Sequence, residues 1–165
     1  MTAVLADSSV WVAHFRKSND VLQSLLAADR VLCHPLIVLE IACGTPPAPR
    51  KRTLGDLNKL QQSVIATTEE TLALIENEQL QDLGCGAVDM SLLASVILTP
   101  ETLLWTVDKN LDALATRLDV AYRDVLGRQT EKLTGPTARL VAAAARPQLI
   151  VMRASQRRAP NRRNA

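Results

Sequence analysis

Short apolar runs alternate with longer segments of helical periodicity, and this alternation restricts the fold of the 165-residue chain more than any other feature. The runs that we expect to be strands cover residues 3–6, 30–33, 63–66, 103–107 and 119–122. Between them, apolar side chains recur at the spacing of one helix face. Strands and helices that alternate in this way build parallel sheets covered by helices. The sequence therefore predicts an α/β fold with a mostly parallel central sheet of about five strands.

Residues that favour helix ends mark where the helices begin and stop. Asp7 or Ser8 can cap a helix that ends near residue 16, because a short side-chain oxygen accepts from free backbone N–H groups. Pro35 and Gly44 enclose another helix in the expected order, with proline first and glycine last. Further helices are expected at residues 20–28, 50–61, 68–83, 88–98 and 109–117.

Charge divides the chain into two parts. Residues 1–127 contain 10 Lys and Arg against 16 Asp and Glu, a formal charge of −6, whereas residues 128–165 contain nine against one, a charge of +8. Such asymmetry favours contact with a nucleic acid or another acidic partner. We expect one domain over residues 1–127 and a basic C-terminal tail over 128–165, largely disordered apart from a short helix at 138–145.

Several classes of protein fit the composition poorly. No apolar run is long enough to span a membrane, and no apolar leader follows the N-terminus. Cys33, Cys43 and Cys85 form no C-x-x-C pair, so we interpret them as small buried side chains in a cytoplasmic protein. The few aromatic residues argue against binding of single strands by base stacking.

Four acidic residues fall where an α/β sheet would gather them. Asp7 and Asp108 directly follow apolar strands, Glu40 interrupts an apolar helix, and Asp89 opens another. Ligands of open parallel sheets bind outside the carboxyl ends of the strands. Each acid has a simpler explanation: Asp7 and Asp89 as helix caps, Asp108 as a turn residue, Glu40 as the partner of an arginine. Their joint placement favours a common site.

A cluster of four carboxylates needs a counter-charge, because like charges raise one another's pKa. Mg²⁺ and Mn²⁺ prefer carboxylate and water oxygens, so an acidic cluster without histidine fits them better than zinc. Such ions can activate a water molecule and neutralise the charge that develops on a phosphodiester. The acids therefore predict a metal-dependent nuclease site.

Four segments resemble, in order and spacing, the motifs of PIN domains, and most closely those of the VapC toxins of bacterial toxin–antitoxin pairs. They are residues 4–11 (VLADSSVW), 35–44 (PLIVLEIACG), 88–94 (VDMSLLA) and 104–108 (LWTVD). The resemblance spans residues 1–123, whereas the chain continues for about 40 residues beyond the usual end of these toxins.

The resemblance implies a three-layer α/β/α fold and an endoribonuclease that depends on Mg²⁺ or Mn²⁺. It also implies an RNA substrate, a homodimer and a cognate VapB-type antitoxin that blocks the site. The catalytic and metal-binding residues would be the four acids, with the first and third as direct metal ligands: Asp7, Glu40, Asp89 and Asp108. The residues that support them by hydrogen bonding would be Ser8 or Ser9, and Thr106.

Two other functions remain open from the residues alone. A phosphohydrolase of the haloacid-dehalogenase kind would use Asp7 as a covalent nucleophile, but it normally requires a second acid where this chain has Ser9. A non-enzymatic PIN-like module would bind RNA or protein and need no metal.

The remaining polar residues fit structural roles more readily than catalytic ones. Asp112 is either an extra acid or part of a solvated helix face, and His14 and His34 suit packing or capping. The basic residues 50–52 either contact RNA phosphates or begin a solvated helix.

Overall fold

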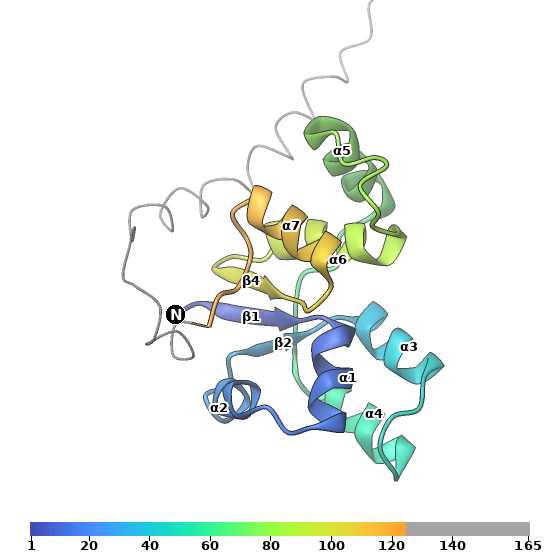
Figure 1. The fold of residues 1–165 in the computed structure, drawn as a ribbon, viewed down its shortest axis with the longest axis vertical. Coiled ribbons are helices and arrows are strands. Elements are labelled where there is room, and N and C mark those ends of the chain that lie inside the picture. Colours follow the sequence, from blue (N-terminus) through green and yellow to red (C-terminus); the bar gives the residue numbers. More distant parts are fainter. Residues whose placement is uncertain (125–165) are drawn as a thin grey trace, which may run out of the picture.

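The chain folds around a four-stranded parallel sheet in this computed structural model, which describes residues 1–124 (Figure 1). The strand order is β3-β2-β1-β4, so the first strand of the chain lies inside the sheet. The predicted α/β class and parallel sheet are confirmed. The strands are β1 (Ala3–Ala6), β2 (Val31–Cys33), β3 (Gln61–Gln62) and β4 (Thr102–Trp105).

Helices fill the connections between the strands, as the alternation in the sequence predicts. Their bounds are α1 (Ser8–Arg16), α2 (Asp20–Ala27), α3 (Pro35–Cys43), α4 (Arg50–Asn58), α5 (Thr68–Glu78), α6 (Ala87–Leu98) and α7 (Lys109–Arg117). Each predicted helix within the described residues is present, and the main differences lie at the C-terminal ends of α4 and α5.

The helices form two layers on either side of the sheet. Right-handed crossovers place the helices that connect β1, β2 and β3 on one face of the sheet. They place the helices between β3 and β4, and the helix after β4, on the opposite face. Figure 1 shows α1 to α4 together in the lower half of the view and α5 to α7 in the upper half. Contacts between α1 and α3, α3 and α4, and α5 and α6 follow the same division. The result is a three-layer α/β/α arrangement.

Strand β1 forms the middle of the hydrophobic core. Val4, Leu5 and Ala6 are fully buried, because β1 pairs with β2 on one side and β4 on the other. Leu92 and Leu93 of α6 are also fully buried. Burial of each such leucine contributes about 1.5–3 kcal/mol. The ends of β1 and β4 are therefore held firmly, and polar residues that follow them have fixed positions.

The strand predicted at residues 63–66 is wrong by two positions, because β3 consists of Gln61 and Gln62. The N–H group of Val64 donates to the hydroxyl of Thr99, the C-cap of α6 (3.0 Å), and that of Ala66 donates to the hydroxyl of Ser95 in α6 (3.1 Å). Side-chain hydroxyls thus replace the sheet ladder for this segment, and the apolar side chains that suggested a buried strand, Val64 and Ile65, are exposed.

The fifth predicted strand, at residues 119–122, is reduced to a single parallel bridge between Leu104 and Ala121. Two hydrogen bonds of 2.7 Å hold it, from Leu104 N to Val120 O and from Tyr122 N to Leu104 O. Helix α5 stops at Glu78 and not near residue 83, because Gln79 adopts the left-handed conformation (φ 52°) that ends the helix.

Two predictions concern parts of the chain outside this description. The basic tail at 128–165 and the helix at 138–145 lie beyond the described residues. Within residues 1–124, none of the helices is both long and apolar enough to cross a membrane.

Candidate active site

The acidic residues gather where the direction of the strand order reverses. The chain adds β2 and β3 on one side of β1 and then returns to place β4 on the other side. In open α/β sheets, this switch point is where ligands bind, at the carboxyl ends of the strands. Asp7 follows β1 and Thr106 follows β4, and the Asp7 N–H donates to the Trp105 carbonyl at 2.8 Å. The carboxyl ends of β1 and β4 therefore lie side by side.

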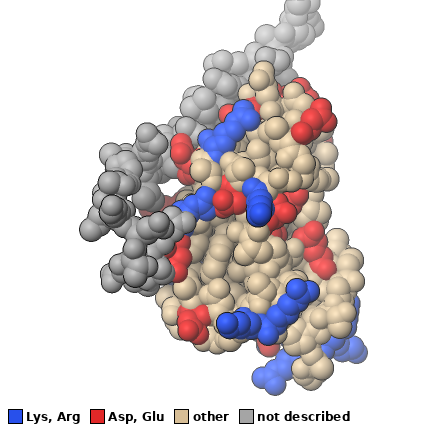
Figure 2. All heavy atoms as spheres, viewed as in Figure 1, with Lys and Arg blue, Asp and Glu red and all other residues tan. Residues whose placement is uncertain are grey.

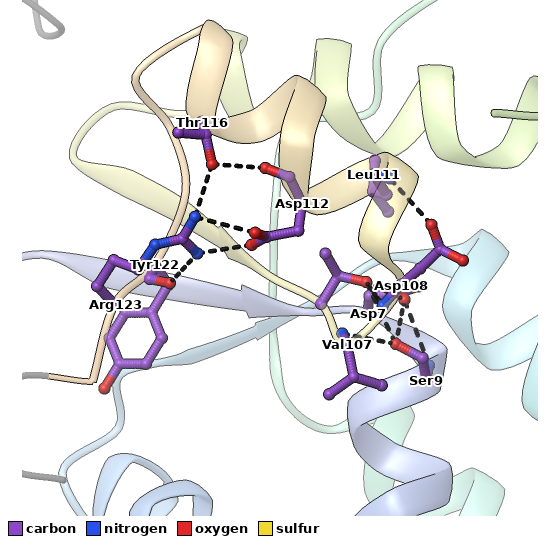
Figure 3. Close-up of polar contacts among 10 residues, drawn as sticks. Asp7, Ser9, Val107, Asp108, Leu111, Asp112, Thr116, Tyr122 and Arg123 are labelled. Atoms are coloured by element: carbon purple, nitrogen blue, oxygen red, sulfur yellow. Dashed lines mark hydrogen bonds and ion pairs between the residues drawn. The ribbon is translucent and has the colours of Figure 1, made fainter. Parts of the chain in front are cut away.

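The carboxylate of Asp7 is buried (4% exposed) and surrounded by donors (Figure 3). Its Oδ1 accepts from the Ser8 N–H at 2.6 Å, and its Oδ2 accepts from the hydroxyls of Ser9 (2.6 Å) and Thr106 (2.9 Å). Asp7 is also the N-cap of α1, whose positive end stabilises a carboxylate. A carboxylate held by this many donors cannot change its orientation freely.

Thr106 connects Asp7 to Asp108. Its hydroxyl donates to Asp7 and accepts from the backbone N–H of Asp108 at 3.0 Å. Asp108 in turn caps α7, because its Oδ1 accepts from the N–H groups of Asn110 and Leu111, both at 2.9 Å. One carboxylate oxygen of Asp108 is thus used to start the helix, and the side chain is otherwise exposed.

Ser8 brings Glu40 to the same edge. The Ser8 hydroxyl donates to Glu40 Oε2 at 2.8 Å and also lies 3.3 Å from Asp7 Oδ1. Glu40 is exposed in the second half of α3, the helix that follows β2. The acid that interrupts an apolar helix therefore has a hydroxyl partner, and not the arginine that was its alternative explanation.

Asp89 lies close enough to Asp7 and Asp108 for their charges to raise its pKa. It is the third residue of α6, where its Oδ2 accepts from the Gly86 N–H at 2.8 Å. Burial raises the pKa of Asp89, the Gly86 hydrogen bond opposes this change, and the charges of Asp7 and Asp108 raise the pKa further. The repulsion among the three acids is what a bound cation would relieve.

Cys85 is a neutral neighbour of this cluster. It is half-buried, and its pKa rises to about 11 because of burial and the charges of Asp89 and Asp108. The thiol therefore remains protonated near neutral pH, which makes it a poor metal ligand. This supports the packing role that the sequence suggested for Cys85, whereas the same expectation is wrong for Cys43, which is exposed.

Asn110 and Gly84 form a contact that the sequence analysis missed. The Asn110 amide donates to the Gly84 carbonyl at 3.3 Å, and a Cβ on Gly84 would lie 2.6 Å from that amide nitrogen. Gly84 has φ 78°, a left-handed conformation that suits glycine. The contact holds the loop that leads to Asp89 against the helix that begins after Asp108. The glycines on either side of Cys85 were its only signal in the sequence.

The other candidate residues have structural partners. Asp112 forms an ion pair of 2.6 Å with Arg123, which Figure 3 shows apart from Asp7 and Asp108. Arg50 donates to the Gly44 carbonyl (3.2 Å) and to the Ala42 carbonyl at the end of α3.

On the one face of residues 1–124 that Figure 2 shows, the other Lys and Arg side chains do not form a continuous basic surface. Arg52 pairs with Asp56, four residues later on α4. On the face shown in Figure 2, Lys and Arg are scattered among Asp and Glu. Arg50 and Arg52 of the cluster at residues 50–52 therefore have local partners.

The donor set fits a hard divalent cation. Among residues 1–124, one oxygen each of Glu40, Asp89 and Asp108 accepts no hydrogen bond, and these oxygens belong to the exposed or half-buried acids. In the same range, no three Asp, Glu, His or Cys side chains are grouped tightly enough to hold an ion by themselves. Mg²⁺ usually binds through one or two carboxylates and keeps several water molecules, so the arrangement suits it.

The part of the chain that forms this sheet and carries these acids matches a known family. Residues 4–117 match the model of the PIN domain, and the chain belongs to this family. Two relatives, each called Ribonuclease VapC32, come from two strains of Mycobacterium tuberculosis, CDC 1551 / Oshkosh and ATCC 25618 / H37Rv. Each is 40% identical over 121 residues, which cover 73% of this chain and 97% of the relative. The resemblance to VapC-type PIN domains is confirmed.

Proposed function

We propose that this protein is the toxin of a type II toxin–antitoxin pair and acts as an endoribonuclease that hydrolyses RNA phosphodiester bonds. Its membership of the PIN family and its 40% identity to proteins called ribonuclease VapC32 support the class of reaction. The observation that carries the proposal is the group of acids at the switch point: Asp7 and Asp108 share Thr106, and their charges add to the effect of burial in raising the pKa of Asp89.

Catalysis by VapC-type PIN domains depends on a divalent cation, and we propose Mg²⁺ or Mn²⁺ here because the donors are carboxylate oxygens. Asp7 and Asp89 would be direct ligands, with Glu40 and Asp108 completing the site. When bound, the cation supplies Lewis-acid chemistry, which stabilises negative charge on a phosphodiester and favours deprotonation of water.

The side chains around the acids hold them ready for the cation. Ser9 and Thr106 fix Asp7, so the buried carboxylate does not reorient when a cation or substrate binds. Ser8 keeps Glu40 at the same edge. Such preorganised groups need no rearrangement during the reaction, which is the main source of electrostatic catalysis.

The remaining parts of the proposal follow from the family resemblance. We propose a VapB-type antitoxin that blocks the acidic site, a homodimer and a cytoplasmic location, where Cys33, Cys43 and Cys85 would stay as the free thiols present here. We also retain the division into a nuclease domain at 1–127 and a basic tail at 128–165.

RNA cleavage tests the proposal directly. The full chain is incubated with RNA and Mg²⁺ or Mn²⁺, with and without EDTA, beside the variants Asp7→Asn and Asp56→Asn. We expect cleavage that EDTA and Asp7→Asn abolish. Within residues 1–124, Asp56 pairs with surface Lys59 and Arg52, so its variant should cleave normally. Activity that survives both EDTA and Asp7→Asn would refute the proposal.

Calorimetry separates an enzyme from a binding module of the same fold. A nuclease should bind Mn²⁺ in the absence of RNA, and Asp89→Asn should remove that binding. A protein that binds RNA or a partner without any affinity for Mn²⁺ would instead be the non-enzymatic alternative.

A further inference from the structure

A buried histidine joins the two helix layers beneath the acids. His34 is 1% exposed and lies between β2 and α3, and its Nε2 is 3.2 Å from the hydroxyl of Ser95 in α6. Its Nδ1 accepts from the Leu36 N–H at 3.1 Å, which caps α3. A neutral imidazole carries one proton, so that proton must lie on Nε2 and point to Ser95. Burial lowers the pKa of His34 and favours this neutral form.

Ser95 is fully satisfied by this arrangement. Its hydroxyl donates to the Ser91 carbonyl at 2.7 Å and accepts from the Ala66 N–H at 3.1 Å, which leaves its second lone pair for the proton of His34. Ser95 is 0% exposed and is the one polar residue among the buried residues of α6. A hydrogen-bonded polar pair in such a core takes the place of apolar side chains, so we expect it to have a specific structural role.

The two residues stand on the helices that carry the second and third acids. His34 starts α3, which carries Glu40, and Ser95 lies about 9 Å along the axis of α6 from Asp89. Apart from Ser95, the buried side chains of α6 are apolar, and their non-directional contacts do not by themselves define its axial position. Hydrogen bonds require defined distances and angles. The His34–Ser95 bond thus restricts sliding of α6 past the β2–α3 junction.

We propose that His34 and Ser95 are positioning residues, which set the axial position of α6 and thereby the placement of Asp89 relative to Glu40 and Asp7. The inference rests on the proposed function only in taking these acids as one cation site. Neither residue touches the acids, so their effect is transmitted through the two helices.

Mn²⁺ binding to the full chain, measured by calorimetry without RNA, tests the inference. We expect Ser95→Ala and His34→Asn to weaken Mn²⁺ binding by about tenfold or more, as the loss of outer partners of metal ligands does. His34→Gln places an amide nitrogen where Nε2 lies, so it should keep Mn²⁺ affinity although it loses the cap of α3. In a double-mutant cycle, His34→Asn and Ser95→Ala together should be no worse than either alone.

A buried hydroxyl elsewhere provides the matched control. Thr71 of α5 is 8% exposed, and its hydroxyl donates to the Thr67 carbonyl at 2.9 Å. Thr71→Val should lower the free energy of unfolding without changing Mn²⁺ affinity. All titrations are made on folded protein, and the two His34 variants provide the comparison if Ser95→Ala does not fold.

The outcomes separate this inference from the proposed function. If Ser95→Ala or His34→Asn is less stable but binds Mn²⁺ as the wild type does, the inference is overturned while RNA cleavage by the wild type still stands. If Asn and Gln at position 34 weaken Mn²⁺ binding equally, the role is merely structural and the inference also fails. If the wild type cleaves no RNA but the variants lose Mn²⁺ affinity as expected, only the proposed function fails.

Discussion

Removal of the Thr106 hydroxyl should weaken both the fold and the acidic site. In Thr106→Val, the Asp7 carboxylate loses a donor at 2.9 Å and the Asp108 N–H loses an acceptor at 3.0 Å. A hydrogen bond to a charged group contributes about 1.5–3 kcal/mol and a neutral one about 1 kcal/mol. The free energy of unfolding should therefore fall by about 2.5–4 kcal/mol, because the bond to Asp7 is buried and the bond from Asp108 is partly buried.

Thr106→Ser is the matched control, since it keeps the hydroxyl and loses one methyl group, worth about 0.8 kcal/mol. Urea unfolding followed by tryptophan fluorescence measures the difference, with Trp105 next to the mutated position. RNA cleavage should drop at least about tenfold in the valine variant, because Asp7 and Asp108 lose their common partner, whereas serine should preserve it. If valine and serine unfold within about 0.5 kcal/mol of each other, Thr106 does not hold these acids together.

Three further predictions concern charge and backbone conformation. Without cations, Asp89→Asn should raise the free energy of unfolding at neutral pH, because the raised pKa of Asp89 shows that its charge is unfavourable in the folded state. This gain should vanish as the pH falls towards 3.8, where Asp89 takes up a proton in both states. A gain that persists in acid would contradict this. The wild type should lose stability as the pH falls below 6.5, because His34 has a lowered pKa in the folded state and takes up a proton more readily in the unfolded chain. Urea titrations of His34→Gln should lack this part of the pH dependence. Gly84→Ala should destabilise the fold by about 1–2 kcal/mol, because Gly84 has a left-handed φ of 78°. Gly55→Ala, in open space within α4, should stabilise the fold by about 0.5–1 kcal/mol. Equal melting temperatures of the two variants would refute the conformational argument.

Local chemistry explains why much of the fold could be predicted from the sequence. Pro35 and Gly44 enclose α3 as expected, and Asp7 and Asp108 cap the helices that follow their strands. These signals depend on residues that are neighbours in the chain. The four acids could be proposed for the same reason, because each stands at a recognisable strand or helix boundary.

Contacts between distant segments could not be predicted from local patterns. The strand at 63–66 was misplaced because Ser95 of α6 and Thr99, its C-cap, accept hydrogen bonds from the N–H groups of Ala66 and Val64. Likewise, nothing near Glu40 indicates Ser8 as its partner, and nothing near His34 indicates Ser95. Such pairs depend on how helices pack, and a single sequence carries no direct record of that packing.

Because β1 pairs with β4, the acidic site can assemble only after most of the domain has been synthesised. Asp7 is made at the start of the chain, but Thr106, its partner at 2.9 Å, and Asp108 are among the last residues of the domain. Until β4 leaves the ribosome and docks on β1, the first strand lacks one neighbour and Asp7 lacks a donor. Parallel strands so far apart in sequence pair late in folding, because closing a long loop precedes their contacts. A nascent or truncated chain therefore has no assembled site, and a nuclease built in this way becomes active only when its domain is complete.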